Sequence, residues 1–163
     1  MPNGPFAGYE GQLGAADRIE EGNIVRQKVY NDTGAAITNG DVYFLSWLKD
    51  ADSLSPSARP TLDALATTAI YRQVCVVDNQ PNGLTTIADA AWGYVTTRGY
   101  CPYINTDVTT VAIDRFLQGK NATATAADDG TTITTDSFAI TVGAIFSTSH
   151  IAGILFGDRT LIG

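Results

Sequence analysis

The chain has 163 residues, a length that suits one domain whose core is large enough to fold without disulfide bonds. Charged residues make up 17% of the chain, and 17 acidic against 10 basic residues give a net charge of −7. Because nucleic acids and anionic membranes repel an acidic surface, this composition argues against both as the main partner.

Residues 1–22 are rich in glycine and proline, and their apolar spacing fits neither a helix nor a strand. We predict an extended N-terminal arm over 1–22 and a single β domain over 23–163. The sizeable apolar residues of the arm are spaced as anchors for a neighbouring subunit: Phe6, Tyr9, Leu13 and Ile19. The alternative is a disordered terminus. The arm does not read as a secretory leader, and no run approaches the roughly 18 apolar residues of a membrane span.

The first part of the body alternates strands with short turns. Period-two alternation predicts a strand over 23–30, and turn residues at 31–34 and 39–40 bound a short strand or bend over 35–38. The run 41–48 has apolar residues on both faces, which indicates a central strand or a subunit contact.

The next part begins with a polar, proline-containing loop over 49–60. Apolar residues at helical spacing predict a short helical turn over 62–66, and a strand follows over 69–77. A second loop over 78–83 leads into a short strand over 84–88.

The stretch 91–117 is the clearest β signal in the chain. Alternating aromatic and β-branched residues predict a hairpin of strands 92–97 and 100–104, with Arg98–Gly99 as its turn, and a third strand over 108–117. Its aromatic residues form a possible stacking surface for a sugar or a nucleobase: Trp92, Tyr94, Tyr100 and Tyr103. The simpler interpretation is cross-strand aromatic pairing within a sheet.

The last part reads as an exposed hairpin over 122–135, turning at 128–130, followed by strands over 138–146 and 151–156. About nine short strands with turn signals between them predict an all-β fold, a compact β-barrel or β-sandwich.

Candidate residues for chemistry are few. His150 is the one histidine, and the carboxylates that could complete a triad with it are Asp107, Asp114 and Asp158. No nucleophile elbow is present, so a solvated loop histidine is the better interpretation. Asp128–Asp129 falls short of a calcium loop and indicates a turn instead. We therefore expect no catalytic residue, no metal and no cofactor.

Two cysteines, Cys75 and Cys101, have the spacing of neither a disulfide framework nor a metal site. We expect two buried free thiols in a protein made in a reducing cytosol. A single bridge between them is the alternative.

Three different motifs of turns and strands stand along the chain. They are Ile37-Thr38-Asn39-Gly40-Asp41-Val42, then Ala91-Trp92-Gly93-Tyr94-Val95 with Arg98-Gly99-Tyr100, and Val142-Gly143-Ala144-Ile145 before 151–156. In this layout the chain resembles the small capsid decoration proteins, also called cement or head-stabilising proteins, of tailed bacteriophages.

This resemblance implies a non-enzymatic virion protein that is commonly a trimer. It implies binding to the major capsid protein on the outer surface of the mature head, which the protein stabilises, after synthesis in the host cytoplasm. No lattice-binding residue can be carried over, because the family shares none that matches here. The alternative is a carbohydrate-binding β module of a phage fibre or adhesin, which would use the aromatic surface.

Overall fold

The structure is a computed structural model that describes residues 18–46, 61–63, 73–107, 111–120, 123–143 and 149–157. Its regular structure is almost entirely β, which confirms the predicted fold class. The described strands are β1 (Arg18–Glu21), β2 (Ile24–Tyr30), β3 (Ile37–Thr38), β4 (Val42–Ser46), β5 (Thr61–Asp63), β6 (Gln73–Val77), β7 (Thr86–Ile87), β8 (Trp92–Asn105), β9 (Phe116–Gly119), β10 (Ala126–Gly130), β11 (Ser137–Thr141) and β12 (His150–Leu155). One 3-10 turn, η1 (Gln80–Asn82), lies between β6 and β7.

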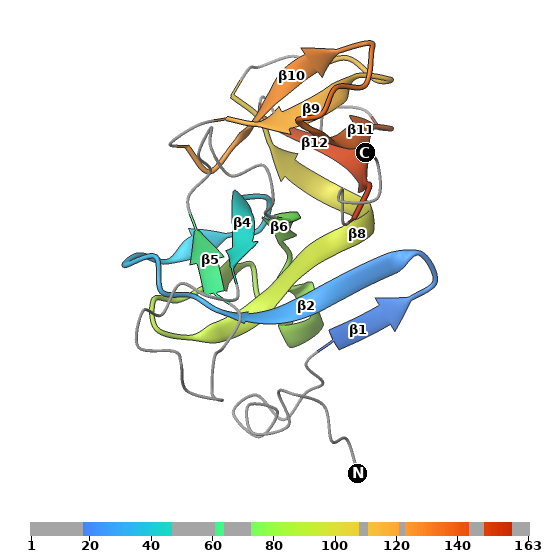
Figure 1. The fold of residues 1–163 in the computed structure, drawn as a ribbon. Coiled ribbons are helices and arrows are strands. Elements are labelled where there is room, and N and C mark those ends of the chain that lie inside the picture. The colour runs from blue at the N-terminus through green and yellow to red at the C-terminus, as the bar shows by residue number, and fades with distance from the viewer. Residues whose placement is uncertain are drawn as a thin grey trace.

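β8 is a single strand of 14 residues that passes through both halves of the fold (Figure 1). Residues 92–98 pair with β2, and Val95 and Thr96 also pair with β6. From Gly99 onward the partner is β12. The predicted hairpin with a turn at Arg98–Gly99 is therefore wrong, because the chain bends at this point and does not reverse.

Gly99 makes this bend possible. Its φ is +87°, a conformation that side chains disfavour, and a Cβ on it would lie 2.1 Å from the carbonyl oxygen of Asn23. The turn between β1 and β2 thus rests directly on the backbone of β8, at a distance that only a glycine tolerates.

The N-terminal half consists of β2, β5, β4, β6 and the first part of β8, whose pairings run in a cycle back to β2. Its core is made of the buried side chains Val29, Ile37, Leu45, Leu62, Cys75, Val77, Ile87 and Val95. Leu62 lies in β5, where the sequence predicts a helical turn over 62–66, and pairing with β4 overrides that local preference.

The C-terminal half is an antiparallel arrangement in the order β8, β12, β11, β9, β10. An isolated bridge between Thr106 and Ala126 brings the end of β8 to the start of β10. A second core of buried residues fills this half, among them Cys101, Ile104, Leu117, Phe138, Ile151 and Leu155.

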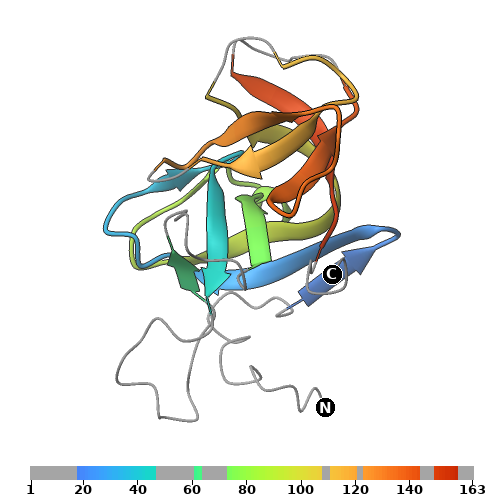
Figure 2. The same ribbon diagram turned by 45° about the horizontal axis from the view of Figure 1, so that its top comes forward.

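β4 and β6 separate the two cores and run side by side below the strands of the C-terminal half (Figure 2). Val42, Phe44 and Val76 belong to the C-terminal core. Leu45, Cys75 and Val77 belong to the N-terminal core. The central strand that the two-faced pattern of 41–48 predicts is confirmed.

Three other predictions are wrong at particular segments. Arg18–Glu21, placed in the arm, pairs with β2 as β1, so the body begins at Arg18 rather than at residue 23. Residues 111–115 precede β9 and are not strand, and Asp114 has a φ of +58°. The turn placed at 128–130 is instead part of β10. The described residues contain twelve strands where about nine are predicted, because strands of two to five residues carry little periodic signal.

A buried ion pair ties the loop after β6 to β2, and a hydrogen bond ties the same loop to the first part of β8. Arg26 Nε donates to Asp78 Oδ2 over 2.8 Å, and Thr96 Oγ1 donates to the same oxygen over 2.9 Å. Both partners of the ion pair are almost completely buried. Removing one member of such a pair costs about 3–5 kcal/mol, because the other charge stays buried without compensation.

The bend at Gly99 generates a prediction with an internal control. Gly34 has nearly the same φ, +86°, but nothing lies within 4 Å of its Cβ position. We expect Gly34→Ala to cost about 1–2 kcal/mol of unfolding free energy, from the backbone conformation alone. Gly99→Ala should cost about 1–3 kcal/mol more, because the new methyl group displaces the Asn23 backbone. Urea unfolding of both variants measures the difference, and equal losses would show that the close approach is unimportant.

Candidate functional site

The predicted aromatic surface is divided by the fold. Trp92 and Tyr94 are buried, and the Trp92 ring packs edge-on against Tyr30 with 5.5 Å between centroids. The other two rings lie on the surface, Tyr100 at 42% and Tyr103 at 40% exposure. They fall beyond the bend of β8, where β12 is the described strand that pairs with it, so the four rings do not form one platform.

Tyr100 belongs instead to a row of apolar side chains across four strands. Strand register places Tyr100 opposite Ile154, Ile154 opposite Ile140, and Ile140 opposite Phe116. Ile154 is 41% exposed, and Ile140 and Phe116 are half-buried. We call these four residues the apolar row.

Two further apolar groups adjoin the apolar row. The Phe156 ring lies 6.1 Å from the Phe116 ring, centroid to centroid. Val142, which directly follows β11 and donates its backbone N–H to the Ala152 carbonyl of β12, is 43% exposed. The sequence predicts the strands that carry the apolar row but not the row itself, because only the register shows which apolar residues become neighbours.

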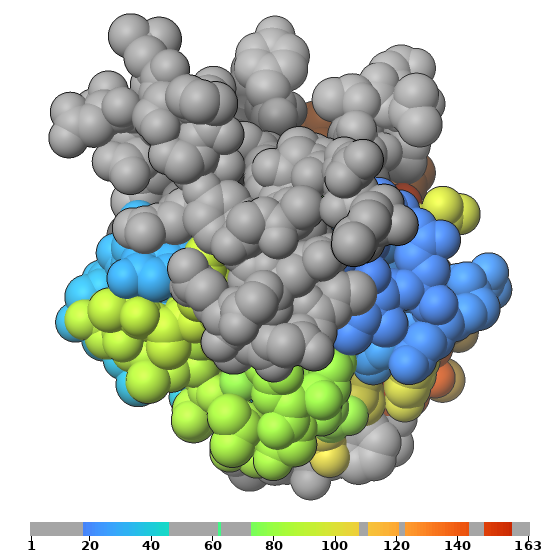
Figure 3. Space-filling view, turned by 90° about the horizontal axis from the view of Figure 1, so that it is seen from below, coloured from blue at the N-terminus to red at the C-terminus, as the bar shows by residue number. Residues whose placement is uncertain are grey.

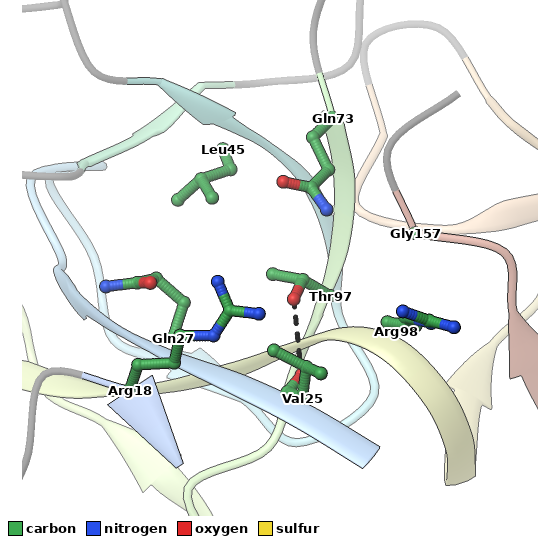
Figure 4. A pocket seen from close by; sticks show the side chains of 8 residues that line it. All are labelled: Arg18, Val25, Gln27, Leu45, Gln73, Thr97, Arg98 and Gly157. Atoms are coloured by element: carbon green, nitrogen blue, oxygen red, sulfur yellow. Dashed lines mark hydrogen bonds between the residues drawn. The ribbon is translucent and has the colours of Figure 1, made fainter. Parts of the chain in front are cut away.

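A cavity of about 270 Å³ opens in the N-terminal half where β1, β2, β4, β6 and β8 come together (Figure 4). Its lining residues are Arg18, Val25, Gln27, Leu45, Gln73, Thr97, Arg98 and Gly157. Figure 4 shows the guanidinium of Arg18 reaching between Gln27 and Thr97, with Arg98 on the other side of Thr97 beside Gly157. β1, which brings Arg18 to the cavity, lies on the surface in the space-filling view (Figure 3).

The cavity is cationic in an acidic chain. Two guanidinium groups are among its described lining residues, and no carboxylate is. Arg18 pairs with Glu20 over 2.7 Å, and both side chains are largely exposed. The Arg98 guanidinium makes no ion pair or hydrogen bond within the described part of the chain, and its stem packs against Gly157. No sequence pattern indicates this site, because its two arginines come from distant segments.

The acidic candidates have structural partners. Arg115 Nε donates to both carboxylate oxygens of Asp128 over 3.0 and 3.1 Å, and this bonding holds the pKa of Asp128 below its usual value. Asp129 accepts hydrogen bonds from Thr134 and Ser137. Both carboxylates thus fasten β10 to its neighbours. In the residues that the structure describes, no group of three or more His, Cys, Asp or Glu is placed to hold a metal ion.

Of the carboxylates proposed as partners of His150, the two that the structure describes, Asp107 and Asp114, have other partners. His150 is half-buried at the start of β12, with its ring edge-on to Tyr103. Asp107 pairs with Lys120 over 2.8 Å, and the backbone N–H of Asp114 donates to Thr141. Asp158 lies outside the described residues.

Of the four predicted anchor residues of the arm, the structure describes one, Ile19. Phe6, Tyr9 and Leu13 lie outside the described residues, so their role as anchors stays a prediction. Ile19 is half-buried in β1 opposite Arg26, which makes it a residue of the sheet.

Comparison with protein-family models, curated proteins and solved structures finds no match for this chain. No helical segment in the described part of the chain has the length and apolar character of a membrane span.

Both cysteines are free and buried, as the sequence predicts, and they belong to different cores. Burial raises the pKa of the Cys75 thiol, and burial likewise raises the pKa of Cys101 to about 12. In the unfolded chain a thiol ionises near pH 8.5. The folded state therefore binds more protons than the unfolded state above that pH, and its stability must fall as pH rises.

We expect the unfolding free energy to decrease above about pH 8.5–9, by up to about 1.4 kcal/mol per pH unit for each thiol. Urea unfolding between pH 7 and pH 10 (roughly the range below tyrosine ionisation) measures this slope. The Cys75→Ala/Cys101→Ala variant should lose the thiol contribution, and an unchanged slope in that variant would contradict the assignment. Reducing agent should leave the wild-type unfolding curve unchanged.

Proposed function

We propose that this chain is a structural virion protein that binds the outer surface of a mature bacteriophage capsid and stabilises it, as a trimer. The single observation that carries the proposal beyond the family resemblance is the apolar row. Scattered exposed apolar residues are normal on a protein surface, whereas contiguous ones mark a contact surface. The apolar row lies on paired strands, so it presents a fixed shape to a subunit or to the major capsid protein.

The proposed stabilisation works by linkage. A protein that binds only the assembled lattice shifts the equilibrium toward it, by about 2.7 kcal/mol per site at a concentration of 100 Kd. A trimer that occupies three sites at once would strengthen this effect through its effective concentration. No reaction is needed for such a role.

The alternative function is a carbohydrate-binding module of a phage fibre or adhesin. The observation that favours it is the exposure of Tyr100 and Tyr103, since sugar rings stack on accessible aromatic faces. Burial of Trp92 and Tyr94 limits such a site to the second part of β8.

The apolar row gives the first test. Tyr100→Thr/Ile154→Thr keeps residues that favour strands but removes most of the exposed apolar surface of the row. We expect this variant to lose co-sedimentation with mature heads, or to lose trimerisation in analytical ultracentrifugation. The matched control is Ile113→Thr/Ile133→Thr, which changes two exposed isoleucines outside the row. Unchanged assembly and head binding in the first variant would contradict the proposal, and a glycan-array signal abolished by Tyr103→Ala would favour the alternative.

The arm gives the second test. Because Arg18 begins β1, the informative deletion ends at residue 17 and leaves the sheet intact. We expect the deleted protein to keep its circular dichroism spectrum but to form weaker trimers or bind heads more weakly. Docking the arm must overcome about 1–2 kcal/mol of backbone entropy per ordered residue, so its anchors need a preformed groove. Sedimentation of the variant that lacks residues 1–17, alone and with mature heads, measures both effects. Unchanged trimer formation and unchanged head binding would show that the arm contributes to neither.

A further inference from the structure

We propose that the cavity between Arg18 and Arg98 binds a carboxylate group carried on a short apolar stem. This inference does not depend on the proposed capsid function, because it rests on the lining of one cavity. Its basis is the combination of cationic donors, apolar wall and existing carboxylate contact at this place.

The cavity supplies hydrogen-bond donors, so it favours a ligand that accepts hydrogen bonds. The guanidinium of Arg18 offers several N–H donors in a planar fork that matches a carboxylate, and the Gln73 amide adds a further donor. Thr97 Oγ1 already donates to the Val25 carbonyl over 3.2 Å, so the anion contacts come from the arginines and Gln73. Arg98, which has no described partner, supplies a second positive charge on the other side of Thr97.

The remaining lining fixes the character of the stem. Leu45 and Val25 provide an apolar wall that methylene groups can contact. The volume of about 270 Å³ lies just below the roughly 300–1,000 Å³ of ordinary ligand pockets, so the ligand is small. No aromatic ring is among the described lining residues, which makes a sugar ring a poor fit. A glutamate side chain or a small dicarboxylic acid meets all three conditions.

The ion pair of Arg18 with Glu20 shows that this guanidinium binds a carboxylate in the folded protein. Both side chains are 59% exposed, and an exposed pair of this kind contributes little to stability. A ligand carboxylate can therefore replace Glu20 at small cost. It follows that Glu20 competes with the ligand, whereas Arg18 binds it.

This competition gives variants with opposite expected effects. We would titrate the full-length protein with sodium glutarate at constant ionic strength and follow the arginine side-chain resonances by NMR. Arg18→Gln should weaken glutarate binding about tenfold or more, and Arg98→Gln should weaken it less. Glu20→Gln should tighten binding, because it frees the Arg18 guanidinium. A purely structural role for these surface residues would not produce effects of opposite sign.

Two controls define the result. Lys120→Gln removes a positive charge that pairs with Asp107 at the end of β9, outside the cavity, and should leave glutarate binding unchanged. Glutaramide, which has the same stem without charge, should not bind. Equal binding of glutaramide, an equal loss in Lys120→Gln, or no saturable shift in the wild-type protein would overturn the proposal.

The source of the carboxylate is decided in a parallel titration. A short end-blocked peptide with one glutamate is compared with the same peptide carrying glutamine in its place. Tighter binding of the glutamate peptide than of glutarate assigns the cavity to an acidic side chain of a protein partner. Binding of glutarate alone assigns it to a free small acid, and binding of neither overturns the proposal.

Discussion

The fold depends on β8 remaining one strand through Gly99. Its first part contributes Val95 to the N-terminal core, and its second part contributes Cys101 and Ile104 to the C-terminal core. Neither core is complete without this strand. β4 and β6 also contribute side chains to both cores. Because the two halves share these strands, they should unfold as one cooperative unit rather than as separate domains.

Buried polar groups hold the loops to this framework. Asn31 donates to the carbonyl oxygens of Ala35, Ile87 and Ala88 and thereby closes the turn after β2 onto β7. The Asn79 side chain donates to Thr86, which holds η1 against the same strand. Each of these amides would cost about 1–3 kcal/mol if it lost its partners while buried. The polar residues of these turns therefore define loop positions, which explains why a chain with few charged residues can still order its connections.

The sequence predicts strands at the positions of β2, β4 and β12. Alternation indicates β2, although four consecutive residues of that strand are buried, and apolar residues on both faces identify β4 as central. Local signals fail where tertiary contacts decide. A glycine with positive φ serves equally in a turn and in a bend, so Gly99 alone does not distinguish a hairpin from one long strand. The aspartates of β10 favour a turn by composition, yet Arg115 binds Asp128 and draws that segment into the sheet.

The candidate surfaces are less predictable than the strands. The apolar row depends on the register between strands, and the cavity depends on residues from distant segments that meet in the fold. The sequence identifies Tyr100 as a candidate surface residue, but its neighbours Ile154 and Ile140 come from two other strands. The cavity joins Arg18 and Arg98, which no sequence pattern links. Periodicity reports which face a residue occupies along its own strand, and it says nothing of which residue from another strand stands beside it.

The bend in β8 places both candidate surfaces on a rigid element. Arg98 and Tyr100 are exposed on either side of buried Gly99, so one lines the cavity and the other begins the apolar row. Groups held on paired strands lose little conformational entropy when they bind, whereas groups on loops must first be ordered. The conformation of Gly99 thus has two consequences, since it lets one strand serve both cores and it fixes the backbone that carries Arg98 and Tyr100.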